Sequence, residues 1–386
     1  MRSDLSGYRR SDGTFGIRNQ VLILATINSV NPTVRRTASA VPGVLPVCPG
    51  FGTGLMGEDA EQYSRTLCNM AVNPNVFGAV IIGLGKEGIA RKIADAMSAA
   101  GRCAYFVDVL EAGGPVNATQ AAVRHACRLT GEASQSRREP MPWTELVLGV
   151  ECGLSDGSSG LVSNPVTGLV ADRVIDCGGT VIMSETVEIL GAEHILAART
   201  RDETTRKRLL SAVDRCVEYA QSCNVNLLGI NPIPENIKGG LSTIEEKALG
   251  AIKKGGSRPL VEVVDYGARP SKKGLVFMDA SSMAVENMTA ICAGGAQAII
   301  FSTGRGHPIG NPISPTVKVT GNPHTVKHLA GSIDVDLSAV ITGEMSFHAA
   351  ADTLEKELVD ICTGKQTQAE LLGETEVAVS RIGRTL

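Results

Sequence analysis

Residues 146–165, LVLGVECGLSDGSSGLVSNP, hold the pattern that decides the fold: a short apolar run followed at once by a polar loop. The run Leu146–Glu151 does not alternate between polar and apolar residues, which is typical of a strand buried on both faces of a sheet. Seven similar runs occur along the chain, at residues 21–26, 79–84, 104–109, 180–184, 225–230, 274–279 and 298–303. Helical stretches lie between them, at residues 58–71, 87–100, 117–129, 202–222 and 243–253. This alternation predicts an α/β fold with mainly parallel sheets covered by helices on both sides.

One polar segment separates two apolar blocks of the chain. Residues 131–142, GEASQSRREPMP, contain two prolines, and such a composition is typical of a domain boundary. We therefore expect one α/β domain over residues 1–135, a linker over residues 136–142 and a second α/β domain over residues 143–386. In sheets of this kind the functional residues lie in the loops at the carboxyl ends of the strands.

The composition excludes several classes of protein. The formal net charge of −3 offers no basic field for a nucleic acid, and aromatic residues, at 3%, are too few for base stacking. No apolar run approaches the roughly 20 residues that span a bilayer. The first residues, MRSDLSGYRRSDG, lack the apolar core of a signal peptide. We therefore expect a cytoplasmic protein that binds neither nucleic acid nor membrane.

Ten cysteines are spread along the chain, and none of them forms a CxxC pair. This pattern predicts reduced thiols, most of them buried. An iron–sulfur cluster would require Cys48, Cys152 and Cys292 to meet in the fold.

Two glycine-rich loops, at residues 52–57 and 83–88, match the pattern GxGxxG. The second follows a strand, opens a helix and has Asp108 at the end of the next strand, which is typical of a nicotinamide dinucleotide site. Such loops also bind smaller anions through free backbone N–H groups, or serve only as tight turns. With 43 glycines in the chain, a chance match is a further explanation.

Polar side chains crowd the loop of the quoted stretch: Glu151, Asp156, Ser158, Ser159 and Asn164. One of them is expected to cap the following helix. A turn alone does not require the others, so we expect at least one of them to take part in function.

Two more carboxylates, Glu185 and Glu188, follow the next apolar run. They are three residues apart and would share one face of a helix. Carboxylates at a buried strand end are candidates for metal ligation or general-base catalysis. The alternative is a solvated first helical turn stabilised by the helix dipole.

The loop at residues 231–250 contains two prolines and two adjacent glycines. Ser242 and Glu245 fit a helix-capping box, which gives both a structural role. The sequence suggests no such role for Asn236 or Lys238. A lysine in this setting is suited to neutralising a carboxylate or a sulfonate.

Residues 301–312, FSTGRGHPIGNP, directly follow an apolar run. Arg305 and His307 lie here among glycines and prolines, so a rigid loop presents a permanent cation beside a group that titrates near neutrality. An arginine can bind a carboxylate with two parallel hydrogen bonds. We expect this loop to belong to the functional site.

Seven stretches, in order along nearly the whole chain, resemble the altronate/galactarate dehydratase family of sugar-acid lyases. They are GYRRSDGTFGIRN (7–19), NPNVFGAVIIGLGKEG (73–88), ECGLSDGSSGLVSNPVTG (151–168), ETVEILGAEHIL (185–196), IKGGLSTIEEKALGAIKKG (237–255), GLVFMDASS (274–282) and FSTGRGHPIGNPISPTVKVTGN (301–322). The resemblance implies a flavodoxin-like domain, knotted in a relative, followed by a Rossmann-like domain. It also implies a divalent metal, Fe²⁺, and an oligomeric lyase that eliminates a β-substituent from a small anionic 2-hydroxy acid.

Two departures from the family bear on the substrate. Full-length dehydratases carry a small N-terminal β-rich domain, whereas this sequence opens on GYRRSDG. In two-component relatives such as (2R)-3-sulfolactate sulfo-lyase, that domain is a separate small subunit. The dehydratases also have a histidine in the motif that here reads CPGFG (48–52). Both departures favour the large subunit of a sulfo-lyase that releases sulfite, with a dehydratase acting on altronate or galactarate as the alternative.

The resemblance and the loops together suggest roles for the site residues. We expect Arg305 and Lys238 to hold an anion, His307 to act as a base or metal ligand, and Glu151 to be a catalytic carboxylate. The expected metal ligands are Asp156, Glu185 and Glu188. The expected substrate-binding residues are Asn164, Ser158, Ser159, Asn236, Gly304, Gly306 and Lys318, the last on the strand after the Arg305 loop. The rivals are an NAD-dependent oxidoreductase and a non-catalytic sugar-acid-binding protein.

Overall fold

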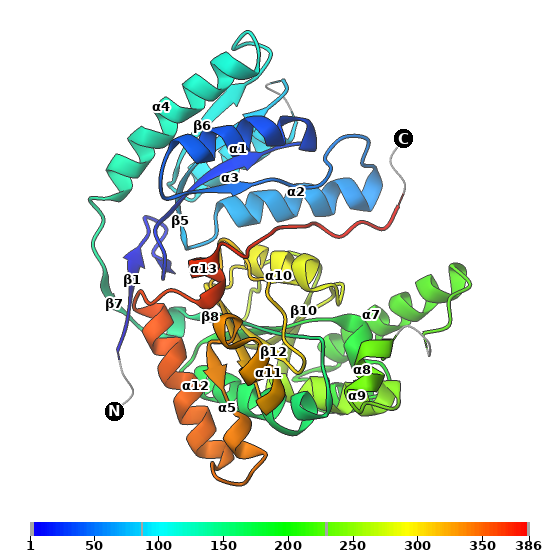
Figure 1. Ribbon diagram of the computed structural model, residues 1–386. Coiled ribbons are helices and arrows are strands. Elements are labelled where there is room, and N and C mark those ends of the chain that lie inside the picture. Colours follow the sequence, from blue (N-terminus) through cyan, green and yellow to red (C-terminus); the bar gives the residue numbers. More distant parts are fainter. Residues whose placement is uncertain (1–3, 86–87, 228–230, 384–386) are drawn as a thin grey trace.

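The computed structural model describes residues 4–85, 88–227 and 231–383. Figure 1 shows two lobes, each built around a sheet with helices on both faces. Every pairing in the two larger sheets is parallel. The predicted α/β fold with mainly parallel sheets is therefore confirmed.

The first lobe contains four parallel strands in the order β4-β3-β5-β6. Their bounds are Val44–Val47, Gln20–Ala25, Val76–Gly83 and Cys103–Asp108. One face is covered by α1 (Asn31–Ala40) and α4 (Pro115–Ala133), and the other by α2 (Gly57–Ala71) and α3 (Ile89–Ala99). Alternate side chains of β3 and β5 enter these two cores, which is why both strands read as unbroken apolar runs.

The second lobe contains seven parallel strands in the order β10-β11-β9-β8-β12-β13-β14. In that order their bounds are Leu260–Val264, Gly274–Met278, Thr180–Met183, Val147–Gly153, Ala298–Thr303, Thr316–Thr320 and Val335–Asp336. The chain leaves β8 toward one edge of the sheet and later returns, through β12, to build the other edge. The strand order therefore reverses between β8 and β12, and open α/β sheets bind their ligands at the carboxyl ends of such a pair.

Helices of the second lobe place its sheet between two cores. On one face lie α5 (Asn164–Asp176) and α12 (Phe347–Cys362), and on the other lies α10 (Ala284–Ala293), which also packs against α2 of the first lobe. The remaining α-helices are α6 (Glu193–Ala197), α7 (Glu203–Ser222), α8 (Pro234–Lys238), α9 (Ile244–Ala251), α11 (Pro323–His328) and α13 (Gln368–Leu372). The 3₁₀ turn η5 (Ile252–Gly255) continues α9.

Parts of the sequence prediction differ from the structure. Residues 225–227 of the strand expected at 225–230 form no strand, and the rest of it lies outside the described residues. Strands β4 and β10 were not predicted, because Pro46 and Glu262 interrupt their apolar runs. Part of the expected linker, Glu139–Met141, forms strand β7.

Strand β7 belongs to a small antiparallel sheet between the lobes. It pairs with β1 (Leu5–Arg9), which also pairs with β2 (Phe15–Gly16). This sheet holds the chain where it passes from one lobe to the other (Figure 1).

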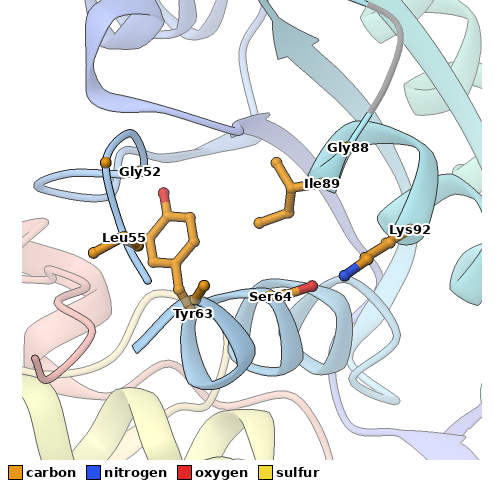
Figure 2. Close-up of a pocket in the computed structure, with 9 residues that line it drawn as sticks. Gly52, Leu55, Tyr63, Ser64, Gly88, Ile89 and Lys92 are labelled. Atoms are coloured by element: carbon orange, nitrogen blue, oxygen red, sulfur yellow. The ribbon is translucent and has the colours of Figure 1, made fainter. Parts of the chain in front are cut away.

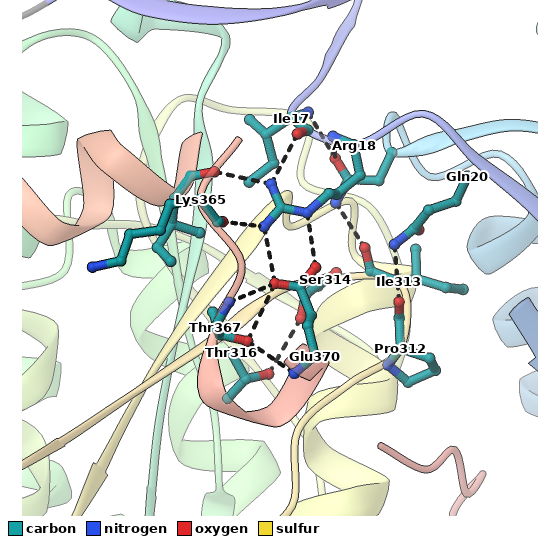
Figure 3. A network of polar contacts seen from close by, with 12 residues as sticks. Ile17, Arg18, Gln20, Pro312, Ile313, Ser314, Thr316, Lys365, Thr367 and Glu370 are labelled. Carbon is teal, nitrogen blue, oxygen red and sulfur yellow. Dashed lines mark hydrogen bonds and ion pairs between the residues drawn. The ribbon is translucent and has the colours of Figure 1, made fainter. Parts of the chain in front are cut away.

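A polar network centred on Arg18 also joins the lobes (Figure 3). Its guanidinium binds the Glu370 carboxylate with two hydrogen bonds of 2.8 and 2.9 Å and donates to the backbone carbonyls of Ile361 and Lys365. Fork-to-fork pairing of this kind fixes geometry as well as adding energy. The start of β3 is thereby tied to the end of α12 and to α13.

The last described segment runs back from the second lobe to the first, as the red trace in Figure 1 shows. The backbone N–H groups of Ile382 and Gly383 donate to the Asp59 carboxylate of α2 at 2.8 and 2.7 Å. Closer to α13, Gly310 exchanges backbone hydrogen bonds with Glu374 and Glu376. The segment therefore connects α2 to the loop that carries Arg305 and His307.

The described cysteines form no disulfide bonds, and only Cys152, Cys292 and Cys362 are buried. The prediction that most would be buried is wrong, since the other seven are half-buried or exposed. No helix among the described residues is long and apolar enough to cross a membrane.

Two glycine contacts let η5 approach α5 closely and let α9 approach the turn before α5. A Cβ atom at Gly168 of α5 would overlap the carbonyl oxygen of Lys253 in η5, and a Cβ atom at Gly250 of α9 would lie 3.0 Å from the Cα atom of Gly160 in that turn. Gly131 in α4, by contrast, has open space around the position of a Cβ. The position of η5 therefore depends on the absence of a side chain at residue 168.

We expect Gly168→Ala to lower the free energy of unfolding by about 2 kcal/mol, because overpacking a close contact typically costs ~1–3 kcal/mol. Gly131→Ala is the matched helical control, and it should leave stability unchanged or raise it by up to about 1 kcal/mol. Urea unfolding followed by circular dichroism measures both. Equal stability of the two variants would show that the close contact is dispensable.

Candidate functional site

The carboxyl ends of β8 and β12 lie side by side where the strand order reverses. Across the pair, Glu151 is opposite Phe301 and Cys152 is opposite Ser302. Neighbouring residues of a strand point to opposite faces, so Glu151 contacts α10 and Cys152 contacts η5. Two groups of polar side chains therefore lie back to back at this strand end.

On the η5 side, Lys254 binds Glu185 and Cys152. Its Nζ lies 2.5 Å from Glu185 Oε2 and 3.1 Å from Cys152 Sγ. The same Oε2 accepts a hydrogen bond of 3.2 Å from the backbone N–H of Cys152. The side chains of Lys254 and Glu185 are fully buried. The Glu185 carboxylate is thus shared between a buried ammonium and the backbone of β8.

Burial shifts the titration of this group. It raises the pKa of Glu185 to about 7, although the Lys254 ammonium acts in the opposite direction. Burial also raises the pKa of the Cys152 thiol, so the sulfur stays protonated at neutral pH. The negative groups around Lys254 raise the pKa of its ammonium despite its burial, which keeps it charged.

On the α10 side, Glu151 has no cation of its own. Its Oε2 accepts a hydrogen bond from the side-chain amide of Asn287, and its Oε1 has no partner among the described residues. Burial raises the pKa of Glu151 well above its usual range, and the Glu185 carboxylate raises it further. A buried carboxyl group whose pKa is raised in this way is a candidate for acid–base chemistry.

A second ion pair lies next to the first. Glu188, in the 3₁₀ turn η4 (Thr186–Ile189), binds the Lys247 ammonium of α9 at 2.8 Å. Two lysines of the α9–η5 segment therefore pair with two glutamates that follow β9.

The predicted metal ligands do not form a ligand set here. Glu185 and Glu188 each bind a lysine ammonium, and Asp156 accepts hydrogen bonds from neighbouring side chains. Within residues 4–85, 88–227 and 231–383, no three His, Cys, Asp or Glu side chains converge so that they could hold a metal ion. The same finding means that Cys48, Cys152 and Cys292 do not meet.

Asp156 organises the loop after β8. Its Oδ1 accepts from Ser158 Oγ at 2.6 Å and from the Ser159 N–H at 3.2 Å, and its Oδ2 accepts from Asn322 Nδ2 at 2.7 Å. A Cβ atom at Gly304 would overlap this carboxylate, so the glycine permits the close approach. The structure therefore gives Asp156, Ser158 and Ser159 a structural role at the start of the π-helical turn η3, residues 159–163.

Asn164 is buried behind this turn. Its Nδ2 donates to the backbone carbonyl of Gly250 at 3.1 Å, whereas its Oδ1 has no partner among the described residues. The residue thus ties α5 to α9 and keeps one free acceptor.

Arg305 lies at the rim of the site. Its backbone N–H donates to Leu154 at 3.0 Å, which fixes the β12 loop against the β8 loop. The exposed guanidinium makes only a 3.3 Å hydrogen bond to the backbone carbonyl of Glu235, and no carboxylate pairs with it in the described part of the chain. Its positive charge is therefore available to an anion.

Helix α8 brings Lys238 to the same rim. Asn236 donates to the backbone carbonyl of Ser155 at 2.8 Å and accepts from the N–H of Ile233, so its role is to attach α8 to the β8 loop. Lys238 at the end of α8 is exposed and forms no ion pair with the described carboxylates. The structure thus brings Lys238 and Arg305 to neighbouring segments.

His307 lies beside the β8 end, with its ring tilted against Phe301 at a centroid distance of 5.3 Å. Burial lowers its pKa, and the Lys318 ammonium lowers it further, so the ring is neutral at neutral pH. Its Nδ1 accepts a hydrogen bond of 3.4 Å from the Ile309 N–H, which places the ring proton on Nε2. The neutral ring is therefore a hydrogen-bond donor at Nε2.

Lys318 and Gly306 shape the loop from behind. Lys318 is fully buried on β13 and donates to the backbone carbonyl of Pro308. Gly306 has a φ of 90°, and a Cβ atom there would overlap Leu329. Both residues position the His307 loop rather than face its rim.

The two GxGxxG loops lie on either side of a pocket in the first lobe (Figure 2). The pocket has a volume of about 180 Å³, and its lining includes Gly52, Tyr63, Ser64, Gly88 and Lys92. Ligand pockets typically measure about 300–1,000 Å³, so this one is small for a dinucleotide. Residues 86 and 87 of the second loop lie outside the described residues.

Sequence reasoning missed several residues of the buried cluster beneath the site. The sequence suggested no role for Lys247, which lies in the helix expected at residues 243–253, for Lys254, which directly follows it, or for Asn287. The expected capping box is displaced by one residue, because Thr243 caps α9 and Glu246, not Glu245, accepts from Ser242. The sequence shows only how far apart these two lysines and two glutamates lie along the chain, which does not reveal that they pair.

The chain is similar to two family models and to several known proteins. A family model described as D-galactarate/Altronate dehydratase, C-terminal, matches residues 143–385, and one described as D-galactarate dehydratase/Altronate hydrolase, second domain, matches residues 7–134. The chain is 37% identical to the (2R)-sulfolactate sulfo-lyase subunit beta of Chromohalobacter salexigens over 97% of each chain. It is 32% identical to the altronate dehydratase of Escherichia coli, over 98% of this chain and 78% of the relative. It is 30% identical to the galactarate dehydratase (L-threo-forming) of the same organism, over 93% of this chain and 73% of the relative.

The raised pKa of Glu151 predicts how stability depends on pH. The folded state binds this proton more tightly than the unfolded state, so the stabilisation is complete below the unfolded pKa and is lost as pH rises above it. Glu151→Gln removes the titration while keeping an acceptor for Asn287. We expect the variant to gain stability relative to the wild type as pH is raised from 5 to about 8.

Urea unfolding at several pH values measures this difference. Glu132→Gln, on the exposed surface of α4, serves as the control and should run parallel to the wild type. A constant difference between Glu151→Gln and the wild type would contradict the expectation.

Proposed function

The chain belongs to the D-galactarate/altronate dehydratase family, and on this premise we propose that it is a lyase that releases sulfite from (2R)-3-sulfolactate and leaves pyruvate. The observation that carries the substrate is the 37% identity to a sulfolactate sulfo-lyase subunit beta, which extends over 97% of both chains. The dehydratase relatives are 30 to 32% identical and are matched over 73 to 78% of their length. Dehydration of altronate or galactarate is the second candidate.

The proposed elimination begins at the carbon that bears the 2-hydroxyl. Glu151, in its carboxylate form, removes the proton from this carbon, and its raised pKa makes that carboxylate a stronger base than an exposed glutamate. The electron pair left behind forms the double bond to the neighbouring carbon, whose bond to sulfur breaks, and sulfite departs with the bonding electrons. The enol of pyruvate then becomes the 2-oxo acid.

The rim residues bind the charges of the substrate. Arg305 and Lys238 offer two exposed cations for the carboxylate and the sulfonate. The Nε2–H of His307 donates to an oxygen of the carboxylate as negative charge develops there in the transition state. This replaces the expected role of His307 as a base.

The proposal includes a partner, a metal and an assembly. The name of the sulfo-lyase relative, subunit beta, supports a separate partner subunit for this chain. Ferrous iron is proposed from the family resemblance alone, because the expected ligands Glu185 and Glu188 bind lysines and Asp156 binds Ser158 and Asn322. An oligomeric assembly and a cytoplasmic location complete the proposal.

The test is an assay of the chain together with a candidate small subunit, with and without ferrous iron. Pyruvate and sulfite should both form from (2R)-3-sulfolactate in equal amounts. Altronate and galactarate are assayed in parallel. Turnover of either sugar acid without turnover of sulfolactate would move the assignment to the dehydratases.

Arg305→Ala should lower kcat/KM by about 100-fold, because a charge-assisted bidentate contact to the substrate is lost. Arg305→Lys should recover only part of this, since lysine cannot form the two parallel bonds. Arg124→Ala, on the surface of α4 in the first lobe, is the control and should match the wild type. Steady-state kinetics with sulfolactate measure all three, and an Arg305→Ala enzyme within about threefold of the wild type would remove Arg305 from the site.

A further inference from the structure

The buried cluster beneath the end of β8 contains a lysine that the proposed chemistry does not use. Lys254 is fully buried although lysine almost never is unless it is paired. Its Nζ contacts two groups, the Glu185 carboxylate at 2.5 Å and the Cys152 sulfur at 3.1 Å. A buried ammonium is costly to keep, so its position calls for a physical account.

The contacts of Lys254 lead directly to Glu151. Lys254 binds Glu185, and the same oxygen of Glu185 accepts the backbone N–H of Cys152. Cys152 is the residue that follows Glu151 in β8. The ammonium therefore fixes the backbone at the point from which the Glu151 side chain leaves the strand.

The distribution of charge on the two faces of β8 also supports an indirect connection between Lys254 and Glu151. Beneath this end, the buried glutamates Glu151, Glu185 and Glu188 lie near Lys247 and Lys254, the two lysines of the α9–η5 segment. Each ammonium binds one of the two carboxylates after β9, and neither binds Glu151. Glu151 is therefore the glutamate of the cluster whose carboxyl group no ammonium binds.

We propose that Lys254 is a positioning residue of the elimination, which acts through Glu185 to hold the end of β8 and thereby the Glu151 carboxyl group. This role rests on the proposed function, because it assumes that Glu151 acts on the substrate. Lys254 itself does not touch the substrate. Its loss should therefore lower kcat and leave KM nearly unchanged.

The experiment compares Lys254→Met with Lys247→Met in the assembled enzyme. Both substitutions remove a lysine of the α9–η5 segment and leave a buried glutamate without its cation, so they match in their effect on folding. We expect Lys254→Met to lower kcat by about 100-fold with KM within about threefold, and Lys247→Met to keep kcat within about threefold of the wild type. Lys254→Arg, which retains the cation, should recover at least about tenfold of the lost kcat.

A double-substitution cycle separates positioning through Glu185 from a general structural role. If Lys254 acts through Glu185, the double variant with Lys254→Met and Glu185→Gln should lose no more kcat than the worse single variant. The double variant also contains no unpaired charge, so it remains informative if Lys254→Met alone fails to fold. Multiplicative losses in the cycle, or a folded double variant with wild-type kcat, would overturn the proposal.

A substrate deuterated at the carbon bearing the hydroxyl provides a further readout. A displaced Glu151 makes proton removal slower relative to the other steps, so the isotope effect on kcat should rise in Lys254→Met and not in Lys247→Met. An isotope effect unchanged from the wild type in Lys254→Met would contradict positioning. A wild-type enzyme inactive with every substrate would instead refute the proposed function.

Discussion

The burial of charge beneath the end of β8 is the constraint on which the second lobe depends. An ammonium and a carboxylate removed from water are stable only if each finds its partner with good geometry, because an unpaired buried charge costs several kcal/mol. Lys254 and Glu185 meet this condition at 2.5 Å. Two features of the chain serve it: Glu185 adopts a left-handed backbone with φ of 75°, and Gly168 lets η5 approach α5. The strained backbone at Glu185 and the close contact at Gly168 therefore both follow from the placement of one ion pair.

The first lobe stabilises the opposite face of the same strand end. Asn287, which holds Glu151, belongs to α10, and α10 lies between the second sheet and α2. The buried side chain of Asn73 donates to the backbone carbonyls of Cys292 and Ala296 at the end of this helix. Because these contacts cross between the lobes, the geometry of Glu151 depends on both. The first lobe is thus part of the site's framework even where it contributes no residue to its rim.

The sequence predicted those parts of the fold that depend on local patterns. Unbroken apolar runs correctly identified β8, whose end carries Glu151, and β12, which is followed by the polar loop with Arg305 and His307. The side chains that organise the site could not be found in this way. Asp156 looked like a ligand, yet it binds Ser158 and Asn322, because only the fold brings β13's loop to it.

Lys254 shows the same limit of sequence reasoning in the opposite case. Asp156 looked functional and has a structural role, whereas Lys254 looked exposed and is buried. In the sequence it stands in the polar stretch KKGG (253–256), which is typical of an exposed helix end. The fold buries it because a glutamate 69 positions earlier in the chain, at the end of another strand, needs a cation. Pairings between residues so distant in sequence are set by strand order and close packing, which composition and periodicity do not encode.

The distribution of charge over the site bears on which substrate it suits. The interior lysines, Lys254 and Lys247, are neutralised by glutamates and offer no net charge to a ligand. The cations that remain available among the described residues of the rim are Arg305 and Lys238. Two exposed cations match a dianion with a carboxylate at one end and a sulfonate at the other. Altronate has one charge and would leave one of these cations unpaired. Galactarate has two charges, but like altronate it has several hydroxyls and would require hydrogen-bonding partners for its chain. The polar side chains that could have served it, Asp156, Ser158 and Ser159, are instead bonded to one another.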